Sequence, residues 1–182
     1  LNFCNLKDDV IFSVPTGNFG NVYAGFVAKK MGLPIKKLIV ASNSNDVLTR
    51  FFQSGKMEKK KPVATISPSM DIQISSNFER LLYFYFKNNS NKINELYKKL
   101  EKKGQFVVKE EILQEILKIF DKGKLSDNHT KNTIKEIFEE HRIIVDPHTA
   151  VGINIGRKKY KNIKKIFLAT AHYGKFINTV RD

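Results

Sequence analysis

Residues 17–21, with the sequence GNFGN, are the part of the chain whose residue types and spacing best suit a ligand. Two glycines three positions apart let the backbone bend and come close to a bound group. The helix predicted to follow adds unpaired amides and roughly half a positive charge at its N-terminus, which suits a phosphate. The loop has neither the GxGxxG nor the GxxxxGK[ST] spacing of nucleotide-binding loops. On its own it predicts either a phosphate site or, with equal weight, a tight strand-to-helix connection.

Thr170 and His172 follow an apolar run at residues 166–169, which we predict to be the last strand. Ligands in open α/β sheets bind beyond the carboxyl ends of strands, so both side chains are candidates for ligand contact. Residues 17–21 and the polar stretch 43–46 also follow predicted strands, and the three strand ends could converge on one crevice. The alternative, which position alone favours, is that Thr170 caps the next helix and His172 is a surface or core histidine.

Arg50 is a weaker candidate, for a substrate phosphate. It stands four residues after Asp46, a spacing that more often marks an ordinary ion pair on a helix. Asp146 and Pro147 have the pattern of a helix N-cap followed by proline, which leaves His148 as a modest ligand candidate. The four histidines and single cysteine indicate neither a metal site nor a Ser/His/Asp set for nucleophilic catalysis.

Strands and helices alternate near the start of the chain. Residues 10–14 predict a strand, a helix follows the 17–21 loop, and residues 38–42 predict a second strand. This order indicates a βαβ unit, whose strands lie parallel in one sheet with helices on its faces. A helix with an apolar side follows at residues 47–52, and residues 63–66 are a candidate third strand.

A further helix is predicted to start at Ser76, because Ser76 and Glu79 have the spacing of a capping box. Residues 90–142 are predicted to be helical throughout, since apolar side chains recur there at helical spacing. A helix opened by Asp146 then leads to the last strand. The sequence therefore predicts a single α/β domain over residues 1–182, with a mostly helical insertion at about residues 88–142.

The chain has 182 residues, of which 32 are basic and 18 acidic, giving a formal net charge of +14. Its one cysteine, Cys4, cannot form an internal disulfide, which favours a reducing cytoplasm. No uncharged apolar run approaches the roughly eighteen residues that a membrane span requires. Most of the basic residues are lysines spread along the chain, which indicates a solvated surface rather than a nucleic-acid footprint.

Five separate stretches, in this order, resemble the C-terminal part of bacterial threonine synthases: SVPTGNFGNVYAGFVAKKMGLP, ASNSND, SPSMDIQISSNFERLLY, DPHTAVG and LATAHYGKF. The resemblance covers nearly the whole chain and is least distinctive at residues 88–131. It implies a pyridoxal phosphate (PLP) enzyme of the tryptophan synthase β-like fold, fold type II, present only in part. Such enzymes convert O-phospho-L-homoserine and water to L-threonine and phosphate.

Carried over by matching motif, the resemblance implies that one loop holds the phosphate of PLP, formed by Gly17, Asn18, Phe19, Gly20 and Asn21. It implies that the Thr170 hydroxyl faces the pyridine nitrogen, and a hydroxyl there does not strongly favour a protonated ring. The family's Schiff-base lysine lies in a Phe-Lys-Asp motif of the N-terminal part, which nothing here matches, and Lys175 is not in such a motif. The expectation is therefore a C-terminal fragment that is inactive by itself.

Two alternatives stay open on the sequence. One is another enzyme of fold type II, such as a dehydratase or a β-replacement enzyme. The other is a non-catalytic module that binds anions or nucleic acid through its lysines, whose affinity would fall steeply with salt. Basic charge alone does not explain the ordered motifs.

Overall fold

The computed structural model describes residues 9–181, so Cys4 lies outside the described residues. The strands are β1 (Val10–Pro15), β2 (Ile35–Ser42), β3 (Lys56–Glu58), β4 (Gln105–Val107), β5 (Phe120–Lys124) and β6 (Lys164–Phe167). The helices are α1 (Gly20–Lys30), α2 (Val47–Ser54), α3 (Phe78–Tyr85), α4 (Ser90–Lys103), α5 (Glu110–Leu117), α6 (Asp127–His141), α7 (Pro147–Arg157) and α8 (Ile177–Arg181). The single-turn 3₁₀ helices η1 (Pro68–Met70) and η2 (Tyr173–Phe176) complete the set.

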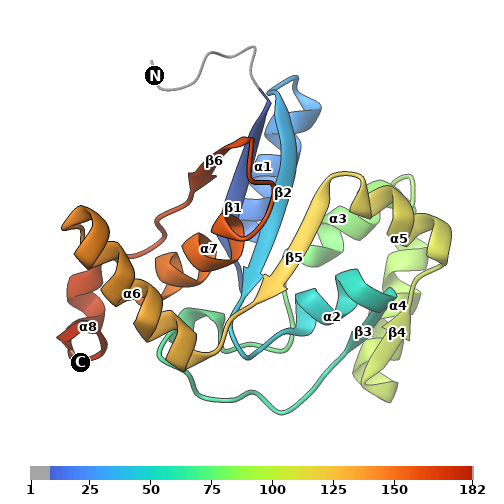
Figure 1. The fold of residues 1–182 in the computed structure, drawn as a ribbon. Helices are drawn as coiled ribbons and strands as arrows, with labels where there is room; N and C mark the ends of the chain where they lie inside the picture. The colour runs from blue at the N-terminus through green and yellow to red at the C-terminus, as the bar shows by residue number, and fades with distance from the viewer. Residues whose placement is uncertain (1–8, 182) are drawn as a thin grey trace.

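Four strands form one parallel sheet in the order β5-β2-β1-β6 (Figure 1). The two central strands, β1 and β2, are apolar along most of their length, as strands covered on both faces must be. Strands β3 and β4 form a separate antiparallel pair beside α2 and α4. The predicted α/β class with a parallel sheet is confirmed.

The side chains of each strand alternate between the two faces of the sheet, and helices cover both faces. Leu38 and Val40 of β2 belong to the larger core, which also contains apolar residues of α1 to α5. Ile39 and Ala41 point to the opposite face, where they pack with α7, and α6 lies against α7. Gly156 permits the close approach of α7, since a Cβ there would lie 2.8 Å from the Ser13 Cβ.

Three predictions of local structure are wrong. Residues 90–142 are not helical throughout, because β4 and β5 interrupt the helices and β5 joins the main sheet. Residues 63–66 form no strand, and the Thr65 amide donates to the Asp71 carboxylate, 2.8 Å away. Helix α3 begins at Phe78 instead of Ser76, and no side chain among the described residues caps it.

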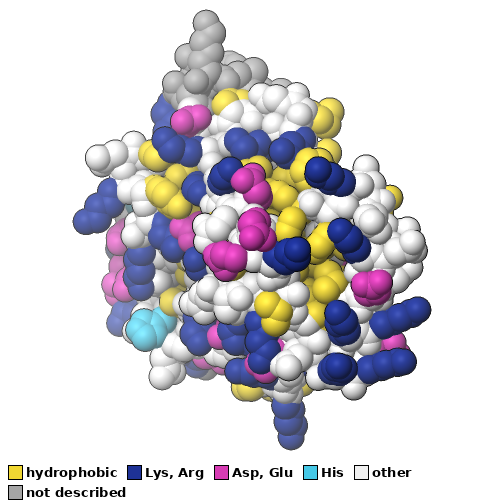
Figure 2. Space-filling view, turned by 90° about the vertical axis from the view of Figure 1, so that its right-hand side faces the viewer, with side chains coloured by type: hydrophobic (Ala, Val, Ile, Leu, Met, Phe, Trp, Pro, Cys, Tyr) yellow, Lys and Arg dark blue, Asp and Glu magenta, His cyan; other side chains and the backbone are white. Residues whose placement is uncertain are grey.

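On the face of the molecule drawn in Figure 2, charged side chains of both signs are mixed. Figure 2 shows Lys and Arg side chains spread across one face with Asp and Glu side chains among them. This distribution favours a solvated surface over a continuous polyanion-binding patch. Within residues 9–181, no helix has the length and apolar content needed to cross a bilayer.

Candidate functional site

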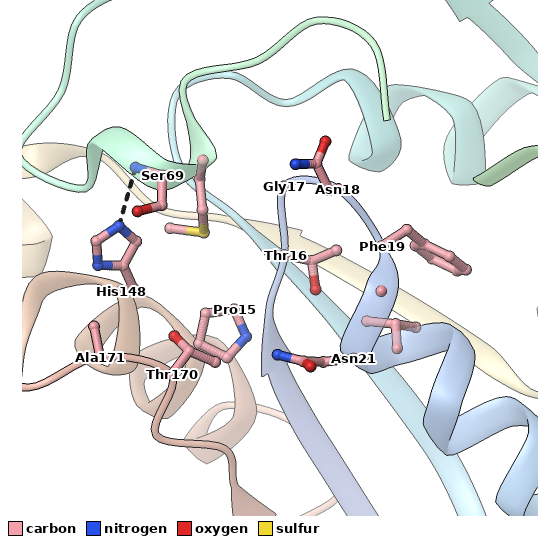
Figure 3. Close-up of a pocket in the computed structure, with 13 residues that line it drawn as sticks. Pro15, Thr16, Gly17, Asn18, Phe19, Asn21, Ser69, His148, Thr170 and Ala171 are labelled. Carbon is pink, nitrogen blue, oxygen red and sulfur yellow. Dashed lines mark hydrogen bonds between the residues drawn. The ribbon is translucent and has the colours of Figure 1, made fainter. Parts of the chain in front are cut away.

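A pocket of about 260 Å³ opens at the carboxyl end of β1 (Figure 3). Figure 3 shows Thr16, Asn21 and Thr170 around the open space, with the Phe19 ring directed away from it. The residues that line it come from β1, the 17–21 loop, α1, η1, α7 and the segment after β6: Pro15, Thr16, Gly17, Asn18, Phe19, Gly20, Asn21, Val22, Ser69, Met70, His148, Thr170 and Ala171. The lining therefore includes every residue for which the family resemblance implies cofactor contact.

The strand order explains why residues distant in the chain meet here. Strands β1 and β6 are parallel neighbours, with Ser13 beside Phe167. Their carboxyl ends therefore lie at the same edge of the sheet, and the chain that leaves each strand reaches the same pocket. Residues 43–46, which follow β2, are not among the lining residues, so two of the three predicted strand ends share this pocket.

The left-handed residue of the 17–21 loop is Phe19, not either glycine. Phe19 has φ 67° and ψ 6°, the left-handed conformation that L-residues with a side chain seldom adopt. Its ring is 1% exposed and packs among the rings of Phe52, Phe78 and Phe120. Burial of the ring thus offsets the cost of the unfavourable backbone, and neither loop glycine needs a positive φ.

Gly17 is required for a different reason, which is close packing. A Cβ at this position would lie 2.9 Å from the Ser69 carbonyl oxygen and 3.2 Å from the Met70 Cα. Both are backbone atoms of η1, which cannot move aside as a flexible side chain would. The absence of a side chain at Gly17 lets η1 form a wall of the pocket.

The start of α1 presents free amides to the pocket. The first amides of a helix have no partner within it, and no side chain of the described residues caps α1. Gly20 and Asn21 are exposed, and no carboxylate is among the described residues that line the pocket. Backbone amides, a helix N-terminus and no competing negative charge suit a phosphate dianion. The residues present therefore fit the phosphate group of PLP.

His148 fixes the wall formed by η1. It lies in the first turn of α7, where its Nε2 accepts a hydrogen bond from the Ser69 amide at 3.2 Å. Its Nδ1 lies 2.9 Å from Asp146 Oδ1. Because Nε2 accepts, the ring proton is on Nδ1 and is donated to the carboxylate. The histidine that the sequence identified as a modest ligand candidate thus lines the pocket and holds a second lining residue in place.

Asp146 caps α7 as predicted, accepting from the His148 amide at 2.9 Å. Burial acts to raise the pKa of Asp146, but hydrogen bonds from His148 and Thr149 outweigh this effect and the pKa is lowered. Asp146 is therefore a buried carboxylate whose charge is satisfied by its own helix and by the histidine.

Arg50 is not among the residues that line the pocket. Its Nε donates to Asp46 at 2.9 Å, the ion pair that the four-residue spacing indicates. The rest of the guanidinium donates to Glu58 and Gln73. These contacts occupy most of its donors and disfavour a role in binding the substrate phosphate.

His172 and Lys175 also lie outside the set of lining residues. The His172 Nδ1 accepts from the Gly174 amide at 3.1 Å and caps η2, so the capping role considered for Thr170 belongs to His172. Lys175 is exposed within η2. Thr170, also exposed, keeps its place at the pocket.

Ser69 and Met70 line the pocket although nothing in the sequence had pointed to them. Together with Pro68 they form η1, a segment whose sequence has no apolar periodicity that would predict it. The only local signal is Ser67-Pro68, since a serine before a proline favours the start of a turn. Their position depends on contacts with Gly17 and His148, which are distant in sequence.

No family model matches the chain. The chain is 43% identical to threonine synthase of Saccharomyces cerevisiae, over 98% of its own length and 39% of that protein. It superimposes with a TM-score of 0.92 on a crystal structure of PLP-bound threonine synthase from Brucella melitensis, at 42% identity, covering 95% of this chain and 38% of that one. An L-serine ammonia-lyase from Rhizomucor miehei shares the fold alone, with a TM-score of 0.52 at 11% identity, covering 96% of this chain and 50% of that one. The chain is therefore a homologue of threonine synthase with the α/β fold of fold type II PLP enzymes, and it spans somewhat over a third of the length of those synthases.

Proposed function

We propose that the chain is the C-terminal part of a threonine synthase and forms much of its PLP-binding domain. The whole enzyme would convert O-phospho-L-homoserine and water to L-threonine and phosphate in the cytoplasm. The observation that carries the proposal is that the 17–21 loop and Thr170 line one pocket. The identity to threonine synthases of more than 40% over nearly the whole chain supports it.

In this proposal the chain anchors and orients the cofactor. The amides of the 17–21 loop and of the first turn of α1 bind the phosphate. The Thr170 hydroxyl would be the partner of the pyridine nitrogen, which would then have no carboxylate partner. When bound, PLP supplies an electron sink for substrate carbanions. The neutral partner at the nitrogen moderates this sink, so that control of the reaction depends more on positioned proton-transfer groups.

The chain by itself is proposed to be inactive, because no residue matches the Phe-Lys-Asp motif that carries the family's Schiff-base lysine. Covalent catalysis of this kind needs a deprotonated lysine at the reacting carbon. Mixing the protein with PLP should give no threonine from O-phospho-L-homoserine. An absorbance band of covalently bound PLP that a single Lys→Ala change abolishes would contradict this part of the proposal.

The binding role is tested by comparing PLP with pyridoxal, which lacks the phosphate, by equilibrium dialysis. PLP should bind and pyridoxal should bind far more weakly, because the loop amides recognise the phosphate. Inorganic phosphate should compete with PLP. Equal affinity for PLP and pyridoxal would sink the proposal.

The rival enzyme activities are separated in the full-length protein. A threonine synthase should release phosphate and threonine from O-phospho-L-homoserine. A dehydratase would instead form a keto acid from serine or threonine.

A further inference from the structure

The 17–21 loop is held from behind by the segment before α3, residues 75–77. The Ser75 hydroxyl donates to the Gly17 carbonyl oxygen at 2.8 Å. Ser75 is 2% exposed, and this bond is partly buried. A buried serine hydroxyl that donates to a loop carbonyl fixes the orientation of the peptide unit to which that carbonyl belongs.

Asn77 holds the next carbonyl of the loop. Its backbone amide and its side-chain Nδ2 both donate to the Asn18 carbonyl oxygen, at 3.1 Å and 3.0 Å. Asn77 occupies the N-cap position of α3, where asparagine usually caps the helix with its side chain. Here the Asn77 side chain makes no such bond and donates to the loop carbonyl instead.

Peptide geometry converts these contacts into an orientation of the loop amides. In a trans peptide the C=O of one residue and the N–H of the next point in opposite directions. Holding the Gly17 and Asn18 carbonyls toward residues 75–77 therefore turns the Asn18 and Phe19 amides the other way. Both residues line the pocket, and the chain contains no cis peptide bond among its described residues.

We propose that Ser75 and Asn77 are positioning residues of the phosphate site, which direct the Asn18 and Phe19 amides toward the pocket without touching the ligand. Neither residue is among those that line the pocket. This inference rests on the proposed role of the pocket in binding PLP. It gives a function to two residues of the SSN stretch that precedes α3.

The adjacent Ser76 supplies a matched control. It is exposed, and among residues 9–181 its hydroxyl makes only a long contact of 3.4 Å with the Asn18 side chain, not with a loop carbonyl. Ser75→Ala should weaken PLP binding about tenfold, the equilibrium equivalent of one well-placed hydrogen bond. Asn77→Ala should weaken it about threefold, since the backbone amide of residue 77 still donates. Ser76→Ala should leave the affinity unchanged.

Measuring the binding of pyridoxal distinguishes a loss of amide positioning from general damage to the fold. The weak binding of pyridoxal should be the same in all three variants, because only the phosphate is read by the amides. If Ser75→Ala does not fold, Asn77→Ala and Ser76→Ala carry the comparison. Equal PLP affinity of the Asn77→Ala and Ser76→Ala proteins, or an equal loss of PLP and pyridoxal binding, would overturn the inference.

A second readout needs no ligand. The ¹⁵N–¹H resonances of Asn18 and Phe19 should shift in Ser75→Ala and Asn77→Ala but not in Ser76→Ala, because the peptide units rotate. Unchanged resonances would overturn the inference even if PLP binds. Absence of PLP binding to the unmutated protein, with the resonances shifting as expected, would instead refute the proposed function and leave the positioning intact.

Discussion

The Phe19 ring lies edge-on to the Phe78 ring, with centroids 5.1 Å apart and an interplanar angle of 86°. Phe19 belongs to the phosphate-binding loop of the proposed site, and Phe78 is the first residue of α3. The loop and the start of α3 are thus joined by this ring contact in the core as well as by the hydrogen bonds from Ser75 and Asn77. The backbone conformation of the 17–21 loop is consequently coupled to the larger hydrophobic core.

Replacement of Phe19 tests this coupling. Phe19→Ala should lower the free energy of unfolding by about 3–5 kcal/mol, because a buried ring is lost. Phe19→Gly should be less destabilising than Phe19→Ala by about 1 kcal/mol, since glycine adopts a positive φ without penalty. Urea denaturation of the two variants measures the difference. A more stable Phe19→Ala than Phe19→Gly protein would contradict a left-handed backbone at residue 19.

The close packing at Gly17 predicts an asymmetry between the two loop glycines. Gly17→Ala should cost about 1–3 kcal/mol of stability, because the new methyl meets backbone atoms of η1. Gly20→Ala is the control, since a Cβ there would be 3.5 Å from the Asn77 side chain, an ordinary contact. In thermal unfolding, the melting temperature of Gly20→Ala should be well above that of Gly17→Ala. Equal melting temperatures would mean that η1 is not closely packed against Gly17.

The lowered pKa of Asp146 predicts a pH dependence of stability. Because the pKa is lower in the folded state, the unfolded state binds more protons on acidification. The contribution of Asp146 is therefore complete above its unfolded pKa of about 4 and is lost as the pH falls toward the folded value. Asp146→Asn should reduce the slope of unfolding free energy against pH between about pH 5 and pH 3.

Asp9→Asn is the matched control for this experiment, because the Asp9 side chain is 61% exposed. The carboxyls of Asp46 and Asp121 also have a lowered pKa, so part of the slope should remain in Asp146→Asn. A slope as steep in Asp146→Asn as in the unmutated protein would contradict the assignment.

Asp71 is the centre of a hydrogen-bond network between two loops. Its carboxylate accepts from Asn43 Nδ2 at 2.7 Å and Asn45 Nδ2 at 2.8 Å. It also accepts from the Thr65 hydroxyl at 2.6 Å and the Thr65 amide. Asp71→Ala should cost about 3 kcal/mol, because several partly buried donors lose their acceptor. Asp71→Asn, which keeps one acceptor oxygen, should cost less, and denaturation curves should separate the two. A loss below about 1 kcal/mol for Asp71→Ala would show that water replaces the carboxylate.

The opening βαβ unit and the cap of α7 were predictable because their signals are local. The apolar runs of β1 and β2 and the Asp146-Pro147 pair each indicate their structure without reference to distant residues. Strand β5 has no such signal, because its sequence FDKGK is mostly polar. Its Asp121 is satisfied by Lys159 and Tyr160, far along the chain.

The pocket was predictable only in part, because position alone favours a capping role for Thr170 and the family resemblance was needed to place it at a ligand site. The GNFGN loop and Thr170 follow strand ends, and the order of the strands in the sheet brings them together. The left-handed Phe19 depends on a pocket of other aromatic rings, and the wall at Ser69 depends on His148. Neither dependence is visible in a window of neighbouring residues.

The chain carries a net charge of +14, yet no lysine or arginine is among the described residues that line the pocket, and the hydrogen bonds of its histidine place the ring proton on Nδ1. An anion held there is attracted by short-range peptide dipoles rather than by the long-range field of the lysine-rich exterior. Raising the ionic strength would then screen the lysine-rich surface while leaving recognition by the peptide dipoles of the pocket largely intact. The affinity of the pocket for different anions would therefore depend more on the shape of the anion and the number of its oxygens than on its total charge.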